Sequence, residues 1–323
     1  MISRRALLAG TIVGMLVAPL AAAQPSAKLP RIGVLATTSW PPFEAFRHGL
    51  RDLGYVEGRT IAIEYRWSDG HDERFPELAA ELVRLRVDAI VTWGSVAVRA
   101  ARESSRTIPI VMAASGDAVA TGAVTSYARP TGNVTGMSAL NPDLDGKRLE
   151  LLRQTVPRLR RVAFLGDPRN LLYPFALAAT RTAAARLGLR LSTVEVAADG
   201  DLEGSFVAIT KERADAIVVA PNAVFVLHRK ELADLALKYR LPAIYLHGEH
   251  ARAGGLMAYG PNYDDMFRRA ATYVDKILKG AKPSDLPIGQ PAKFDLVINL
   301  RTARALGLAI PPSVLLQADE VIQ

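Results

Sequence analysis

The strongest constraint on the fold is that the second half of the chain repeats the pattern of the first half. Short apolar segments, each followed by residues with helical periodicity, recur in both halves. Four of them appear in the same order and at nearly constant spacing: RIGVL at 31–35 and RVAFL at 161–165, LGY at 53–55 and LGL at 187–189, DAIV at 88–91 and 215–218, and IPIV at 108–111 and LPAI at 241–244. The repeat predicts two similar lobes, each built of alternating strands and helices.

The first half shows what each lobe should contain. Strands are predicted at 31–36, 60–67, 89–93 and 108–113, where the sequence is apolar or alternates in polarity. Helical periodicity falls between them, and the first helix is expected to end at Gly54, since glycine favours a helix C-terminus. Strands that alternate with helices of this length form a parallel sheet with helices on both faces. We therefore predict an α/β fold of two doubly wound, Rossmann-like lobes with parallel sheets, joined by a multi-strand hinge.

The two ends of the repeat predict the lobe boundaries. Residues 130–136, PTGNVTG, follow the fourth strand and are interpreted as the crossing into the second lobe. After the second copy, a helix at 266–278 and a strand at 294–298 do not extend the repeat. This tail is expected to return to the first lobe and cross again, and the pattern leaves open which lobe holds its end. The expected N-terminal lobe comprises residues 30–138 and 262–288, and the expected C-terminal lobe comprises 139–261 and 289–323.

The N-terminus has the features of an export signal. Arg4 and Arg5 precede an apolar run at 6–20, and three alanines at 21–23 fit a signal-peptidase site. We predict a signal peptide at residues 1–23 and a mature protein in the periplasm; the alternative is an uncleaved membrane anchor. The arginine pair fits both the twin-arginine pathway and the general export pathway. The chain has no cysteine, which excludes a lipoprotein, disulfides and thiolate metal sites.

The charge of the chain does not indicate a nucleic-acid partner. The sequence has 40 Lys and Arg against 32 Asp and Glu, a formal net charge of +8. The basic residues are scattered over the predicted helices and interleaved with acids, so they do not form the concentrated patch that nucleic-acid binding requires. We expect a solvated surface and no nucleic-acid partner.

The residues that follow the predicted strands are the candidate ligand-binding residues. In open parallel sheets, ligands bind beyond the carboxyl ends of the strands. In the first lobe this rule selects Thr38, Ser39, Trp40, Trp93, Gly94, Ser95 and Asp117. In the second lobe it selects Asp167, Asn170, Tyr173, Asn222, His247 and Tyr259.

The chemistry of these residues suits a small polar molecule. Trp40 and Trp93 would supply rigid apolar walls that could stack on a ring or on a cation, and the polar side chains of the second lobe would orient the molecule. Backbone N–H groups at Gly94 and Ser95 suit a carboxylate, whereas an ionised Asp117 suits an ammonium group. A zwitterionic amino acid would use both. The alternative for Asp117 is a helix cap, because a helix is expected to begin directly after it.

The motifs of common enzymes are missing from the sequence. There is no nucleophile elbow, phosphate-binding loop or dinucleotide fingerprint. His247 and His250 do not have the spacing of a helical zinc site, and we interpret them as a loop histidine pair. We predict a protein that is not an enzyme and that needs no cofactor and no metal.

Several phrases of the chain resemble those of a known family. They are LGYVEG at 53–58, IPIVM at 108–112, GNVTG at 132–136, KRLELL at 147–152, GGLMAYG at 254–260, ILKGAKP at 277–283 and NL at 299–300. Over essentially the whole mature chain, the sequence resembles the periplasmic substrate-binding proteins of ABC transporters, in the tryptophan- and aromatic-amino-acid-binding-like group with a type I periplasmic binding protein fold. In this chain Asp117-Ala118 replaces the family's usual Asp-Pro, and Pro130-Thr131-Gly132-Asn133 replaces its usual Pro-Gly-Gly-Asn. The first departure leaves the partner of Asp117 open.

The resemblance implies capture of a ligand without chemistry. The protein would hold a small molecule, an amino acid or an aromatic carboxylate, in the cleft between its lobes and deliver it to a membrane permease. The ABC permease and its ATPase would be separate chains, because the sequence has no phosphate-binding loop and, after the leader, no apolar stretch that could span a bilayer. The protein itself is expected to be a monomer. The alternative function is a sensory module that presents the ligand to a membrane receptor.

Overall fold

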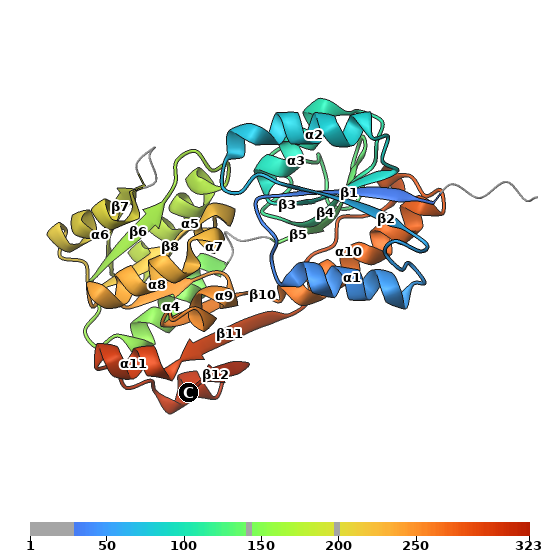
Figure 1. Ribbon diagram of the computed structural model, residues 1–323. Coiled ribbons are helices and arrows are strands. Elements are labelled where there is room, and N and C mark those ends of the chain that lie inside the picture. Colours follow the sequence, from blue (N-terminus) through green and yellow to red (C-terminus); the bar gives the residue numbers. More distant parts are fainter. Residues whose placement is uncertain (1–28, 140–143, 197–200) are drawn as a thin grey trace, which may run out of the picture.

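The chain folds into two α/β lobes that lie side by side. The computed structural model describes residues 29–139, 144–196 and 201–323, and the predicted signal peptide at 1–23 lies outside these residues. Each lobe is a sheet with helices on both faces (Figure 1). This arrangement confirms the predicted fold class.

The first lobe contains five parallel strands in the order β2-β1-β3-β4-β5. They are β1 (Arg31–Ala36), β2 (Ala62–Trp67), β3 (Ala89–Trp93), β4 (Ile110–Ser115) and β5 (Val134–Ser138). On one face lie α1 (Pro42–Asp52) and α10 (Tyr263–Leu278), and on the other lie α2 (Phe75–Arg84) and α3 (Ser95–Ser104) (Figure 1). The first helix is followed by Gly54 with a φ of 88°, as expected of a glycine at a helix C-terminus.

Strand β5 corrects the predicted crossing at 130–136. Val134 to Ser138 is buried and pairs with β4, so the first sheet continues through this stretch. Its small residues allow close packing: Gly136 has a φ of 117°, and a Cβ added there would lie 2.3 Å from the carbonyl oxygen of Met112. The chain leaves the first lobe only after Ser138.

The second lobe contains a larger, mixed sheet in the order β12-β11-β10-β9-β8-β6-β7. Its strands are β6 (Arg161–Gly166), β7 (Arg190–Glu195), β8 (Ala216–Val219), β9 (Ala243–Tyr245), β10 (Met257–Pro261), β11 (Phe294–Asn299) and β12 (Glu320–Ile322). Strand β11 runs antiparallel to β10, whereas the sequence predicted parallel strands throughout. The reason is that β11 enters from the first lobe across the hinge and not through a crossover helix within its own lobe.

Helices cover both faces of the second sheet. One apolar core lies beneath α4 (Asp145–Thr155), α5 (Tyr173–Arg186), α11 (Leu300–Leu306) and α12 (Pro312–Leu315). The other lies beneath α6 (Leu202–Lys211), α8 (Arg229–Lys238) and α9 (Gly248–Arg252), with the short α7 (Ala223–Leu227) beside them. Two short 3-10 helices complete the described elements, η1 (Asp72–Arg74) and η3 (Pro283–Asp285).

The sequence repeat has a structural cause at Asp88 and Asp215. The Asp88 carboxylate accepts a hydrogen bond from the N–H of Arg31, at the start of β1 (2.7 Å). The Asp215 carboxylate accepts from the N–H groups of Arg160 and Arg161, at the start of β6 (3.0 and 2.8 Å). In each lobe an aspartate therefore joins the beginnings of two neighbouring strands, and the same DAIV segment serves both lobes.

The described elements alternate between the lobes three times: between β5 and α4, between β10 and α10, and between η3 and β11. Helix α10 follows the second lobe in sequence but packs on α1 of the first. Their contact is close, because a Cβ added at Gly49 would lie 2.8 Å from the carbonyl oxygen of Arg268. The tail after η3 adds β11 and β12 to the second sheet. The predicted lobe boundaries stay a proposal, which this arrangement supports.

Candidate functional site

A pocket lies between the two lobes, beyond the carboxyl ends of strands from both sheets. It contains about 550 Å³ of space, part of which is open to solvent. Its wall combines residues of the first lobe with residues of the second lobe and the hinge, among them Thr37, Asp72, Phe75, Trp93, Gly94, Ser95, Ser115, Asn170, Leu172, Pro221, Asn222, His247 and Tyr263. The lobes touch beside it: a Cβ added at Gly116 would come within 2.2 Å of Leu172 Cδ1. The two lobes are closed on one another.

The start of α3 presents backbone donors to the pocket. Gly94 leaves β3 with a φ of 89°, which glycine tolerates, and no side chain caps the helix. The next residues, Ser95 to Ala97, line the pocket. Their N–H groups are among those that an α-helix leaves without an intrahelical partner. The hydroxyls of Ser95 and Ser115, 3.2 Å apart, stand beside them. This part of the wall suits a carboxylate.

Aromatic rings form another part of the wall. Trp40 and Trp93 stack with ring centroids 4.3 Å apart and planes 17° from parallel. Trp93 lines the pocket, whereas Trp40 is 2% exposed and lies behind it, edge-on to His247 and Tyr263. Trp93, which is 4% exposed, therefore contributes an apolar aromatic surface to the wall.

Two amide side chains from the second lobe lie in the opposite wall. The Asn222 side-chain oxygen accepts from the N–H of Val224 (2.8 Å) and so caps α7, while its nitrogen donates to Asp167 (3.3 Å). The Asn170 oxygen accepts from the N–H of Leu172 (2.8 Å), and its nitrogen donates to the carbonyl of Pro221 (3.3 Å). These bonds hold the amides in place, so the loops after β6 and β8 enter the pocket already ordered.

Buried histidines lie where the pocket meets the hinge. Nε2 of His250 is 3.1 Å from the carbonyl oxygen of Phe225, and its Nδ1 is 3.2 Å from that of His247. A neutral ring has a single N–H, so one of these contacts is a hydrogen bond at a time. Burial lowers the pKa of His250 to about 4 and holds the pKa of His247 well below its usual value. Both rings are therefore neutral at neutral pH.

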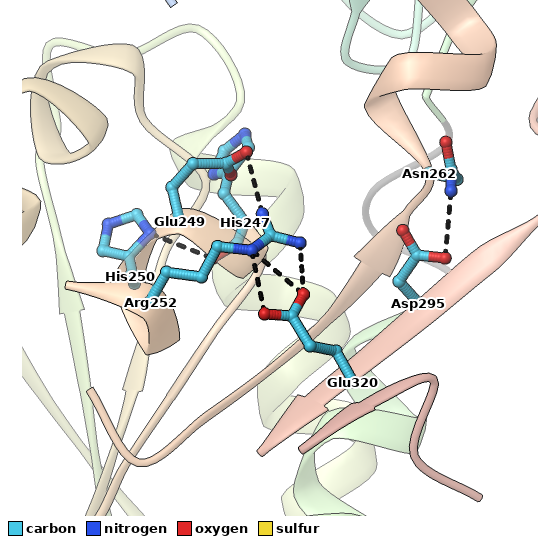
Figure 2. A network of polar contacts seen from close by, with 7 residues as sticks. All are labelled: His247, Glu249, His250, Arg252, Asn262, Asp295 and Glu320. Carbon is cyan, nitrogen blue, oxygen red and sulfur yellow. Dashed lines mark hydrogen bonds and ion pairs between the residues drawn. The ribbon is translucent and has the colours of Figure 1, made fainter. Parts of the chain in front are cut away.

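Separate groups of polar contacts lie along the hinge beside these histidines (Figure 2). Arg252 of α9 donates to Glu320 of β12 (2.6 Å) and contacts Glu249 (3.3 Å). Asn262, which caps α10, donates to Asp295 of β11 (3.1 Å). The Arg252 contacts join α9 to the edge strand β12 within the second lobe, and the Asn262 contact joins the crossing segment after β10 to the beginning of β11.

The pocket brings together many of the predicted residues and leaves others out. Trp93, Gly94, Ser95, Asn170, Asn222 and His247 line it. Trp40 stands one layer behind the wall. Asp167 is 6% exposed, also behind the wall, where it forms an ion pair with Arg169 (2.8 Å).

Thr38, Ser39, Tyr173 and Tyr259 do not line the pocket. Strand β1 ends at Ala36, so Thr37 occupies the wall, and the next two residues are more exposed. The Tyr173 hydroxyl donates to Glu195 (2.6 Å) at the end of β7, an edge strand. Tyr259 lies inside β10, where its ring stacks on Phe294.

Asp117 and the histidine pair also differ from the prediction. One Asp117 carboxylate oxygen accepts from the N–H groups of Val119 and Ala120, both at 3.0 Å, and from the Tyr127 hydroxyl. Asp117 therefore closes a local turn, a role similar to the helix cap that was the alternative in the sequence analysis. It does not line the pocket. His247 directly precedes the short helix α9, and His250 lies inside that helix and not in a loop.

The sequence analysis missed Asp72 and Tyr263. Asp72 lies in η1, beyond the end of β2, and was missed because no residue after that strand was selected. Tyr263 follows β10, which runs to Pro261 and not to Tyr259. Correct strand ends and the whole of each following loop would have found both.

Two similar α/β lobes, three crossings and a pocket shared by both lobes define a two-lobed solute-binding protein of the type I periplasmic class. In the described part of the chain, no group of three or more His, Asp and Glu side chains could hold a metal ion. None of the described helices has the length and apolar character that crossing a membrane requires. The chain belongs to the ABC transporter substrate binding protein family, whose model matches residues 35–322.

Known proteins similar to this chain agree with this membership. A tyrosine-binding protein of Clostridioides difficile is 22% identical over 288 residues, covering 88% of this chain and 82% of that protein. A conserved domain protein of Vibrio cholerae has a structure with a TM-score of 0.85 and 25% identity, covering 91% of this chain and 100% of that one. An ABC domain from Streptococcus pneumoniae in complex with L-Trp has a TM-score of 0.84 and 24% identity, covering 91% and 99%.

Proposed function

We propose that this protein is the binding component of an ABC uptake transporter. It captures an amino acid or an aromatic carboxylate between its lobes and delivers it to a membrane permease. The observation that carries this proposal is a pocket walled by both lobes, in which the uncapped start of α3 and the ring of Trp93 are neighbours. A ligand that contacts both lobes stabilises their closed arrangement, and a permease can distinguish the closed protein from the open one.

The relatives support the class of ligand. One is described as tyrosine-binding and another was solved with L-Trp. Each of these ligands combines a ring with a carboxylate, which are the two groups that the wall of this pocket is suited to hold. In this proposal the carboxylate accepts from the N–H groups at the start of α3, and the ring stacks on Trp93. His247, edge-on to the ring of Trp93, lines the pocket beside it.

The remaining parts of the proposal concern the cellular setting. The protein acts in the periplasm after removal of residues 1–23, as a monomer. The permease and ATPase are separate chains. The bound molecule is released unchanged, since the pocket residues are suited to holding a ligand and, among the described ones, no nucleophile is paired with a base.

A thermal-shift screen of amino acids and aromatic carboxylates tests capture. A ligand at a hundredfold excess over its dissociation constant should stabilise the protein by about 2.7 kcal/mol. Asn222→Ala should reduce the shift, whereas Thr38→Ala, outside the pocket, should not. The proposal is wrong if no compound of either class shifts the melting temperature.

Deletion of the gene tests delivery. Uptake of the ligand identified in the screen should fall in the deleted strain and return when the gene is restored. Retained uptake together with tight binding in vitro would favour the ligand-presenting sensory module.

A further inference from the structure

Asp72 is a carboxylate in the pocket wall for which the described residues supply no partner. It lies in η1 of the first lobe, between β2 and α2, and is half-buried. Within the described residues its side chain makes no hydrogen bond and no ion pair. The other aspartate nearby, Asp167, is fully compensated by Arg169 and by the amide of Asn222. Among the described residues that line the pocket, Asp72 is the one charged side chain.

The charges around Asp72 do not neutralise it. Burial, foremost, then the Asp167 carboxylate across the lobe junction and Glu73 raise the pKa of Asp72, while Arg169 and Arg99 lower it. Arg169 already forms its ion pair with Asp167. A carboxylate in this setting gains stability when a cation arrives in the pocket.

The start of α3 is a separate part of the same wall and has the opposite character. Its N–H groups and the Ser95 hydroxyl favour a negative group. Asp72 favours a positive one. The pocket therefore offers two complementary ends to a molecule that carries both charges, which an aromatic carboxylate does not.

We propose that Asp72 receives the ammonium group of the ligand and thereby selects amino acids over carboxylic acids that lack an amine. This inference rests on the proposed function and decides between its two ligand classes. It also assigns to Asp72 the role that the sequence had suggested for Asp117, whose carboxylate is engaged in its own turn.

Matched pairs of ligands test the proposal by calorimetry. L-Trp, L-Tyr and L-Phe are each compared with the acid that lacks the amine: indole-3-propionate, 3-(4-hydroxyphenyl)propionate and 3-phenylpropionate. The wild type should prefer at least one amino acid by roughly tenfold to a hundredfold, the range expected for a hydrogen bond between charged groups. Asp72→Asn should weaken binding of that amino acid by a similar factor and leave the matched acid nearly unchanged.

Asp69→Asn is the control, because Asp69 is an exposed aspartate three residues earlier that does not line the pocket. It should leave both affinities unchanged. The unliganded Asp72→Asn protein should melt at the same temperature as the wild type or higher, since the substitution removes a charge without a partner. A lower melting temperature would mean that the protein itself stabilises the Asp72 carboxylate, contrary to the proposal.

The other outcomes are distinct. If the wild type binds the acids as tightly as the amino acids, or if Asp72→Asn preserves the preference, Asp72 does not select the ammonium and the proposed function still stands. If no compound of either class binds, the proposed function fails and this inference fails with it.

Discussion

Replacing Asp145 by asparagine should destabilise the protein by about 3–5 kcal/mol, because it leaves a buried guanidinium without a countercharge. Asp145 and Arg148 lie at the start of α4, both 0% exposed, and Nη2 of the arginine donates to the aspartate. Within the described residues, Nε and Nη1 of Arg148 and the second oxygen of Asp145 have no hydrogen-bond partner. The pair therefore has few other contacts that could compensate for the loss of either member.

The magnitude depends on whether Arg148 can lose its proton. Burial lowers the pKa of Arg148 to about 10. In the wild type at pH 7 the guanidinium remains charged, and discharging it would cost about 4 kcal/mol, since each pKa unit corresponds to about 1.4 kcal/mol. Removing the Asp145 charge makes discharge easier in the variant, so deprotonation limits the loss of stability to a few kcal/mol, within the range given above.

Urea unfolding of the variants measures this cost. The control is Glu44→Gln, which breaks an ion pair of the same spacing with Arg47 on the exposed surface and should cost only a small fraction as much. The double variant Asp145→Leu with Arg148→Met removes both charges and should be more stable than Asp145→Asn. A cost below about 1 kcal/mol for Asp145→Asn, or a double variant less stable than that single variant, would refute the reasoning.

The other predictions concern the pocket and the hinge. Saturating ligand should quench or shift the tryptophan fluorescence, because Trp93 lines the pocket with Trp40 stacked on it; an unchanged spectrum would contradict this placement, and Trp93→Phe should remove most of the change. Gly116→Val should weaken ligand binding by roughly tenfold in titrations and leave the unliganded stability nearly unchanged, because the new side chain meets Leu172 of the other lobe only on closure. Adding Leu172→Ala should restore binding, and failure to do so would exclude a clash at this contact. Lowering the pH from about 6.5 to 4 should cost about 3 kcal/mol through His250, because the unfolded ring binds a proton below about 6.5 and the folded ring only near 4. This stability is present above pH 6.5 and is lost on acidification. Urea unfolding of His250→Gln at several pH values tests the assignment, which is wrong if the free energy of unfolding of this variant falls as steeply between pH 6.5 and 4 as that of the wild type.

Much of the fold could be predicted from sequence because the signals that specify it are local. Apolar runs of strand length, helical periodicity and residues such as Gly54 each depend on a few neighbouring positions. Their repetition in the second half added the two-lobed architecture. The antiparallel strand β11 was not predicted, since its direction depends on where the preceding linker crosses the hinge.

The candidate site was predicted in part for a related reason. The rule that ligands bind beyond strand ends depends on topology, and it found Trp93, Ser95 and His247. It selected Asp117 and missed Asp72, although both follow strands of the same sheet. The Asp117 carboxylate accepts hydrogen bonds within its own turn, whereas a longer loop after β2 places Asp72 in the pocket wall.

The sequence alone therefore determined the class of fold, the two lobes and the edge of each sheet where a ligand would bind, because periodicity and strand order specify these. The tertiary structure decided which side chains at that edge face the pocket, since this depends on loop paths and on how the lobes close. Trp40 is an example: a strand-end residue in the sequence, it lies buried behind Trp93 because residues from the second lobe and the hinge, His247 and Tyr263, pack against its other edges.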